Sequence, residues 1–199
     1  MPITIGQRSE GDFSNPLGFL SACHRRIEQF LQVLIEVTSQ ARGGALNGDQ
    51  RNGVEVALRY FREAAPKHTR DEEESLFPRM LASSDKAMRA AIHSLEGLLE
   101  DHKLADAAHA EVEAIGSRWL SDGILSSEST DRLLELLYGL RSSYQRHIAI
   151  EENAIFPLAG DILGSTELAA IGHEIAERRS INLSALESKL KGLSEVESP

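Results

Sequence analysis

An eleven-residue pattern that occurs twice constrains this chain more than any other feature. The first copy starts at His68 and the second at His147, 79 residues later, and both read H-x-x-x-E-E-x-x-(L/I)-F-P. Residues four apart lie on the same face of a helix, so the histidine and the first glutamate of each copy can face one ion. Because the chain contains only seven histidines, we interpret the copies as two halves of one metal site.

Apolar residues at three- and four-residue steps predict helices before and across the first copy. Asn15 can cap a helix that has Pro16 in its first turn and continues to about residue 42. A second helix is predicted from about 49 to 81, with a bend at Pro66, because proline removes a backbone donor and crowds the preceding turn.

Proline also follows both copies of the motif. Pro78 is expected to move Phe77 away from helical geometry and to distort the last turn of the second helix. The third helical pattern follows the turn at residues 83–85 and ends between Gly116 and Leu120.

The second half of the chain repeats the apolar pattern of the first. A shift of 79 residues places 54–76 onto 133–155, and a shift of 78 places 17–27 onto 95–105. The sequence therefore predicts an all-α fold, an up-down four-helix bundle built from two duplicated helix pairs. A shorter fifth helix is predicted from Ser165 to about Arg179.

These patterns divide the chain into three parts. Residues 1–14 form a polar N-terminal segment, 15–160 form the bundle, and 161–199 contain the C-terminal helix and an acidic tail. The net charge of −10 and the absence of a Lys/Arg cluster argue against nucleic acid or an anionic membrane as a partner. Cys23 is the only cysteine, which excludes an intramolecular disulfide and a cage of several thiolates. With neither a signal peptide nor a membrane span in the sequence, we expect a cytoplasmic protein.

Six metal-ligand side chains fall on the apolar stripes of the predicted helices. Two of them, His24 and His102, lie outside the motif, and each alone could equally be a packing residue. We include them as ligands because the duplication relates them to each other. Buried carboxylates are costly unless they are paired or bind a cation, and a set of this size exceeds what one tetrahedral zinc needs. We therefore expect two metal ions, iron in preference to manganese. The expected ligands are His24, His68, Glu72, His102, His147 and Glu151.

Other polar residues near these stripes are expected to play lesser parts. Glu73 and Glu152 lie about 100° round the helix from the ligand glutamates and more plausibly support a ligand imidazole than bind metal. Asp106, one turn after His102, is a candidate additional ligand. Tyr144 is expected to pack in the core, with a pocket or hydrogen-bonding role as the alternative.

The complete ligand series, with the trailing Leu76-Phe77-Pro78 and Ile155-Phe156-Pro157, resembles the haemerythrin-like HHE cation-binding domain over roughly residues 15–160. The resemblance implies a non-haem di-iron centre with an oxo or hydroxo bridge, in which the four histidines are terminal ligands and the two glutamates bridge the irons. Manganese or zinc are alternative metals. Oxygen-carrying haemerythrins have a further histidine where this chain has Asp106, so reversible oxygen carriage is not the expected function.

The resemblance favours bacterial members of the family that act in oxidative or nitrosative stress. The expected function is binding of, or reaction with, a small ligand such as O2, peroxide or NO, in stress response or iron handling. The alternative is a non-enzymatic sensor that a redox or regulatory protein partner reads, for which the C-terminal helix is the candidate contact. The sequence leaves open whether the protein is an enzyme.

Overall fold

The fold is entirely helical in a computed structural model that describes residues 13–183. No strand occurs in this range, which confirms the all-α prediction. Most of the predicted N-terminal segment and of the acidic tail lies outside the described residues, at 1–12 and 184–199. None of the described helices has an apolar stretch long enough to cross a membrane.

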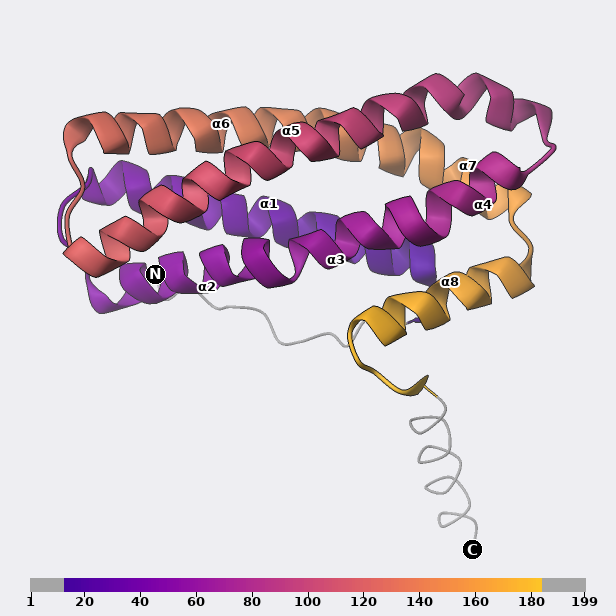
Figure 1. Cartoon of the computed structure of the whole chain (residues 1–199), viewed down its shortest axis with the longest axis horizontal. Helices are drawn as coiled ribbons and strands as arrows, with labels where there is room; N and C mark the ends of the chain where they lie inside the picture. The colour runs from indigo at the N-terminus through magenta and orange to yellow at the C-terminus, as the bar shows by residue number, and fades with distance from the viewer. Residues whose placement is uncertain (1–12, 184–199) are drawn as a thin grey trace, which may run out of the picture.

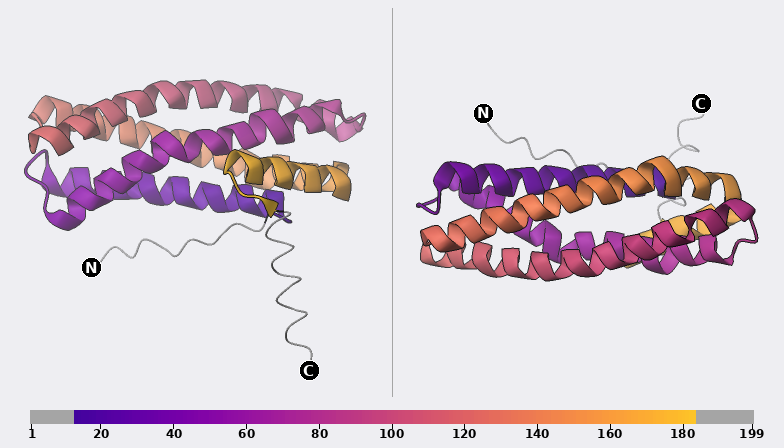
Figure 2. Two further views of the ribbon diagram at one scale, coloured as in Figure 1. Left: turned by 60° about the horizontal axis from the view of Figure 1, so that its bottom comes forward. Right: turned by 90° about the horizontal axis from the view of Figure 1, so that it is seen from above.

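Long helices lie side by side along the molecule, as Figure 1 and both views of Figure 2 show. The elements are α1 (Pro16–Ala41), α2 (Gly48–Glu63), α3 (Ala65–Arg70), η1 (Asp71–Leu76), α4 (Phe77–Ala82), α5 (Lys86–Asp122), α6 (Ser127–Ile150), η2 (Glu151–Ile155), α7 (Phe156–Ile162) and α8 (Ser165–Arg178). Helices α1 and α5 each contact both α2 and α6, so these helices enclose a common interior. Helix α8 packs at one end, against α1 and η1.

The helix starts follow from capping residues. The Gly18 amide donates to the Asn15 side chain at 3.0 Å, and Pro16 occupies the first helical position, as the sequence predicts. Helix α2 starts with a reciprocal capping box, in which Asn47 and Gln50 each accept a hydrogen bond from the other's backbone amide. The stretch predicted as one bent helix follows the succession α2, α3, η1 and α4, with an interruption at Ala64, just before Pro66.

Both copies of the motif contain a π-helical turn, which the sequence prediction missed. In η1 the Phe77 amide donates to the Glu72 carbonyl, and in η2 the Phe156 amide donates to the Glu151 carbonyl, five residues back. The prediction that Phe77 leaves helical geometry is wrong, since its φ and ψ are −61° and −40°. The ring of a proline clashes with a carbonyl of the preceding helical turn, and the residue has no N–H to donate to that turn. Here the wider π turn accommodates the proline, so the helix continues beyond it.

The third helix ends slightly later than the predicted range of Gly116 to Leu120. Helix α5 continues to Asp122 and ends at Gly123, whose φ of 81° suits a glycine C-cap. Gly116 instead allows a close approach, because a Cβ at this position would lie 2.8 Å from Leu58 Cδ1. The glycine therefore serves packing between α5 and α2.

The buried apolar residues form two separate clusters. Leu31, Leu34, Trp119 and Leu137 belong to one, and the other includes residues of α4, α7 and α8. Each of the helical stretches that carries one of the predicted ligand histidines passes from one cluster to the other. In α1, for example, Leu20 belongs to the second cluster and Ile27 to the first, and His24 lies between them. A polar layer is thus enclosed between two apolar ones.

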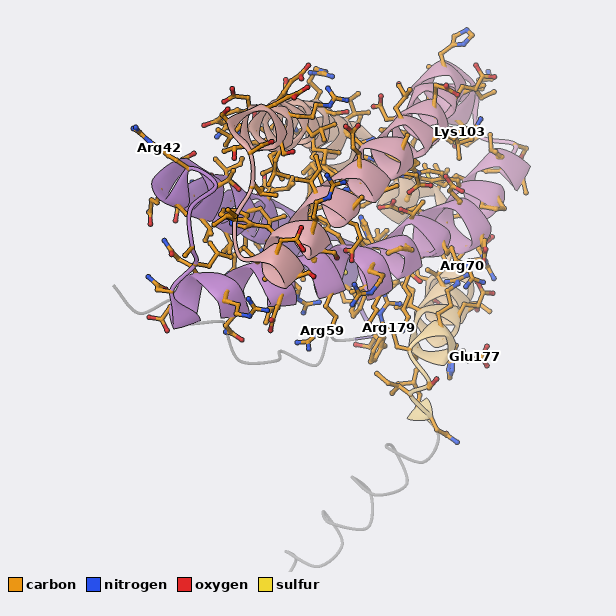
Figure 3. All side chains as sticks on the ribbon, turned by 60° about the vertical axis from the view of Figure 1, so that its left-hand side comes forward. Arg42, Arg59, Arg70, Lys103, Glu177 and Arg179 are labelled. Atoms are coloured by element: carbon orange, nitrogen blue, oxygen red, sulfur yellow. The ribbon has the colours of Figure 1, made fainter. Side chains whose placement is uncertain are left out.

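Helix α8 is joined to the bundle by a buried acid. Asp71, which is fully buried, accepts hydrogen bonds from Arg178 at 2.8 Å and from Arg179 at 2.6 Å. Figure 3 shows Arg179 beside the bundle. Its guanidinium carbon also lies 4.6 Å from the centroid of the Phe19 ring. Burial raises the pKa of Asp71 even though both arginines oppose this shift. The ion pairs therefore offset a large desolvation cost.

Replacing Asp71 should weaken the attachment of α8. Asp71→Asn leaves two guanidinium groups, only 12% and 16% exposed, without their counter-charge. We expect a loss of about 3 kcal/mol in the free energy of unfolding, measured in urea with metal-free protein. The control Glu74→Ala removes a carboxylate that is 48% exposed and should cost less than about 1 kcal/mol. Equal losses in the two variants would contradict a structural role for Asp71.

Candidate metal centre

The structure brings all six predicted ligand side chains together inside the bundle. Each residue exposes at most 7% of its surface. Their donor atoms form two overlapping groups that share Glu72, and within each group the donors lie within 4.8 Å of one another. The first group is His24, His68 and Glu72, and the second is Glu72, His102, His147 and Glu151.

The two copies of the motif have the same local geometry. His68 Nε2 lies 3.2 Å from Glu72 Oε1, and His147 Nε2 lies 3.2 Å from Glu151 Oε1. The i, i+4 spacing on one helix face produces this separation, as the sequence pattern predicts. Each copy thus supplies one imidazole and one carboxylate to the interior.

Each glutamate also reaches the histidines of the other half. Glu72 Oε2 lies 3.5 Å from His102 Nε2, while its Oε1 faces His68 and His24. Glu151 Oε2 lies 3.1 Å from His24 Nε2, while its Oε1 faces His147. Each carboxylate therefore lies between the His24–His68 pair and the His102–His147 pair. Two cations bridged by carboxylates require this arrangement.

The donor atoms are close to one another but poorly paired. Both oxygens of Glu72, both oxygens of Glu151 and Nε2 of His24 are buried without a hydrogen-bond partner. Unpaired buried carboxylates are expensive. Donors that bind an ion at about 2.1 Å and at right angles lie about 3 Å apart, close to the separation of 3.1 Å between His102 Nε2 and His147 Nε2. The residues present therefore fit metal ions.

The electrostatics of the site also favour cations. Burial, together with the neighbouring Glu151 carboxylate, raises the pKa of Glu72 well above its ordinary value. Burial alone would lower the pKa of His24, but Glu151 and Glu72 outweigh it and raise this pKa to about 10. The pKa of His147 is also raised, because Glu151 and Glu72 outweigh its burial. Burial, together with neighbouring histidines, lowers the pKa of His68 and of His102.

Carboxylates outside the cluster orient two of the imidazoles. Glu152 Oε1 lies 2.8 Å from Nδ1 of His24, and Glu73 Oε1 lies 2.8 Å from Nδ1 of His102. Both contacts cross from one half of the duplication to the other, and both leave Nε2 facing the interior. This is the supporting position that the sequence favoured for Glu73 and Glu152.

The remaining two imidazoles differ from each other. His147 Nδ1 has a contact of 3.4 Å with Asp101 Oδ2, whereas His68 Nδ1 is buried without a partner. Asp101 was not among the predicted residues, although its place directly before His102 was a usable signal. Cys23 occupies the equivalent place before His24, and burial raises the pKa of its thiol to about 11.

The other histidines and Asp106 lie outside the donor cluster. Asp106, the candidate additional ligand, is exposed, as are His93 and His173. His109 is partly buried and forms a hydrogen bond of 3.0 Å with the Tyr144 hydroxyl. Tyr144 packs against the first apolar cluster, as the sequence predicts. It also has the pocket and hydrogen-bonding role that the sequence offered as the alternative.

A small cavity adjoins the imidazoles. Its volume is about 10 Å³, roughly the space that one water molecule needs. The lining consists of His24, Ile27, Ala65, His68, Thr69, His102, Tyr144, His147 and Ile148. A ligand of one or a few atoms could therefore sit beside the donor cluster.

Fold and site together define a helical protein with a buried cation-binding cluster of histidines and glutamates. The family described as Hemerythrin HHE cation binding domain matches residues 15–159. The chain belongs to this family. It is also similar to a Haemophilus influenzae protein named "Uncharacterized protein", with 25% identity over 169 residues, which cover 85% of this chain and 92% of the relative.

The outer carboxylates should tune metal affinity. Glu152→Ala and Glu73→Ala each remove the partner of an imidazole Nδ1 and should weaken metal binding by about 10- to 100-fold, measured by competition with a chelator. Asn153→Ala is the control, because Asn153 is exposed and bonds only the backbone of its own helix. Unchanged affinity in both glutamate variants would exclude this role.

His109 should make the protein sensitive to acid. Burial lowers its pKa from 6.5 to about 4, so between these values the unfolded chain binds a proton that the folded chain does not. Stability contributed by the neutral imidazole is therefore complete above pH 6.5 and falls as the pH approaches 4. The slope of unfolding free energy against pH in this range should be shallower in His109→Leu. The exposed His93→Gln should leave it unchanged, and a parallel slope in both variants would refute the assignment.

Proposed function

We propose that this protein is a non-haem di-iron protein that binds or reacts with a small ligand, O2, peroxide or NO, in stress response or iron handling. The proposed ligands are His24, His68, Glu72, His102, His147 and Glu151. The observation that carries the proposal is the pair of buried carboxylates, whose oxygens form no hydrogen bond and which each lie between the two histidine pairs. A mixed set of imidazoles and carboxylates without thiolate suits iron or manganese.

The side chains of the chain would hold, orient and shield the metal ions. The imidazoles present Nε2 inward, and Glu152 and Glu73 hold two of them in that orientation. Bound iron would supply an open coordination position and one-electron redox chemistry. The apolar clusters on either side limit water to the small cavity, so a ligand would compete with few solvent molecules.

The duplication supports the finer description of the fold. We propose that residues 15–160 form an up-down four-helix bundle of two related helix pairs, since both π turns and both His–Glu contacts recur at equivalent positions. A cytoplasmic location remains a prediction from the sequence.

A metal-dependent sensor is the second candidate function, and the attachment of α8 favours it. Asp71, which binds Arg178 and Arg179, directly precedes the proposed ligand Glu72 in the same π turn. A movement of η1 on metal binding would therefore move Asp71 and, through its ion pairs with the two arginines, shift α8. A redox or regulatory protein partner could then recognise α8.

Iron reconstitution tests the proposal. We expect about two iron ions per chain and an absorption change on adding azide, peroxide or NO. His68→Ala combined with Glu151→Ala should lose the metal, while the exposed His93→Ala should keep it. Fewer than two metals in well-loaded protein, or full retention in the double variant, would reject the di-metal site. Turnover of peroxide would favour the enzyme; without turnover, a metal-dependent change in hydrogen exchange confined to α8 and η1 would favour the sensor.

A further inference from the structure

Tyr144 and His109 interrupt the duplication next to the donor cluster. The shift of 79 residues relates Tyr144 to Ala65, and the shift of 78 relates His109 to Leu31. One half thus has two apolar residues where the other has a phenol and an imidazole in hydrogen-bond contact at 3.0 Å. Ala65 and Tyr144 both line the small cavity, so the cavity has a small side chain on one side and a large one on the other.

Tyr144 also lines a second, larger space. A surface groove of about 420 Å³ lies between α1 and α6, two helices that contact each other. Its lining consists of Arg25, Glu28, Gln29, Leu31, Gln32, Arg141, Tyr144 and Gln145. Tyr144 is common to both linings, so it borders the groove as well as the cavity.

His109 holds the Tyr144 side chain in this position. The two are joined through Nε2, and the His109 ring stacks on Phe61 with centroids 4.4 Å apart. His109 lies seven residues, about 10 Å along the helix, beyond His102. The hydroxyl therefore points away from the cluster while the tyrosine ring borders the cavity. The contact between His109 and Tyr144 is a single neutral hydrogen bond, which is weak enough for thermal motion to break.

We propose that Tyr144 is the gate through which a small ligand passes from the α1–α6 groove to the proposed di-metal centre, and that His109 is its latch. Two arginines and one glutamate line the groove, which suits neutral or singly negative ligands of a few atoms. The cavity of about 10 Å³ excludes larger molecules. This inference rests on the proposed function, because it concerns access to the same site.

The kinetics of azide binding to the iron-loaded protein test the gate, using stopped-flow absorption. Removing a gate raises association and dissociation rates together and leaves the equilibrium constant unchanged. Tyr144→Ala should speed both by at least about tenfold, whereas Tyr144→Phe, which loses only the latch bond, should speed both by about fivefold. Gln29→Trp, which places a large ring in the groove, should slow both.

Tyr138→Ala is the matched control. Tyr138 is an exposed tyrosine on the same helix and stacks on Arg141, so its loss disturbs the edge of the groove without reaching the cavity. Its azide rates should match those of the unmodified protein. Equal acceleration in Tyr138→Ala and Tyr144→Ala would overturn the gate.

A readout without metal separates the gate from the proposed function. In metal-free protein, carbethoxylation of His24 and His68, followed by mass spectrometry, should be faster in Tyr144→Ala than in unmodified protein. Unchanged carbethoxylation and azide rates in Tyr144→Ala would overturn the gate while leaving the metal site intact. A changed azide equilibrium constant with an unchanged association rate would instead identify Tyr144 as a ligand contact. Failure to bind iron with faster carbethoxylation would reject the proposed function and support controlled access to the cavity.

Discussion

The structure depends on two carboxylates buried among four imidazoles. Glu72 and Glu151 have no solvent exposure, and their oxygens form no hydrogen bond although histidine nitrogens lie 3.1 to 3.6 Å away. Burying two carboxylates so close together is costly without cations. The apolar clusters enclose this layer on either side. The π turns contain the two glutamates, and the outer carboxylates orient two of the imidazoles. The fold is therefore best understood as an enclosure for charge, with stability supplied by the apolar layers at both ends.

The helices and the convergence of the donor residues could be predicted from the sequence, because they follow from local periodicity and from the internal duplication. The i, i+4 pairs needed only helix geometry, and the duplication added His24 and His102, which have no local signal. The π turns could not be predicted in the same way, since periodicity does not distinguish i→i+4 from i→i+5 bonding. A proline at the same offset in both copies was the available indication.

Contacts between side chains from different helices were harder to predict. Asp101 and His109 act through partners 46 and 35 residues away, and such pairs depend on how neighbouring helices are rotated. Gly116 illustrates the same difficulty, because a residue that commonly ends helices serves here for close packing of α5 against α2. Long-range packing also explains the burial of Asp71, whose arginine partners come from α8.

The contacts from Glu152 to His24 and from Glu73 to His102 connect the halves of the duplication reciprocally. Two separate copies of one helix pair, related by a twofold axis, would make the same reciprocal contacts, so the chain resembles an isologous homodimer joined into one polypeptide. In a homodimer every substitution occurs twice. Once the copies are joined, a residue such as Tyr144 can change on one side alone, which allows a symmetric donor set to be approached from one direction only.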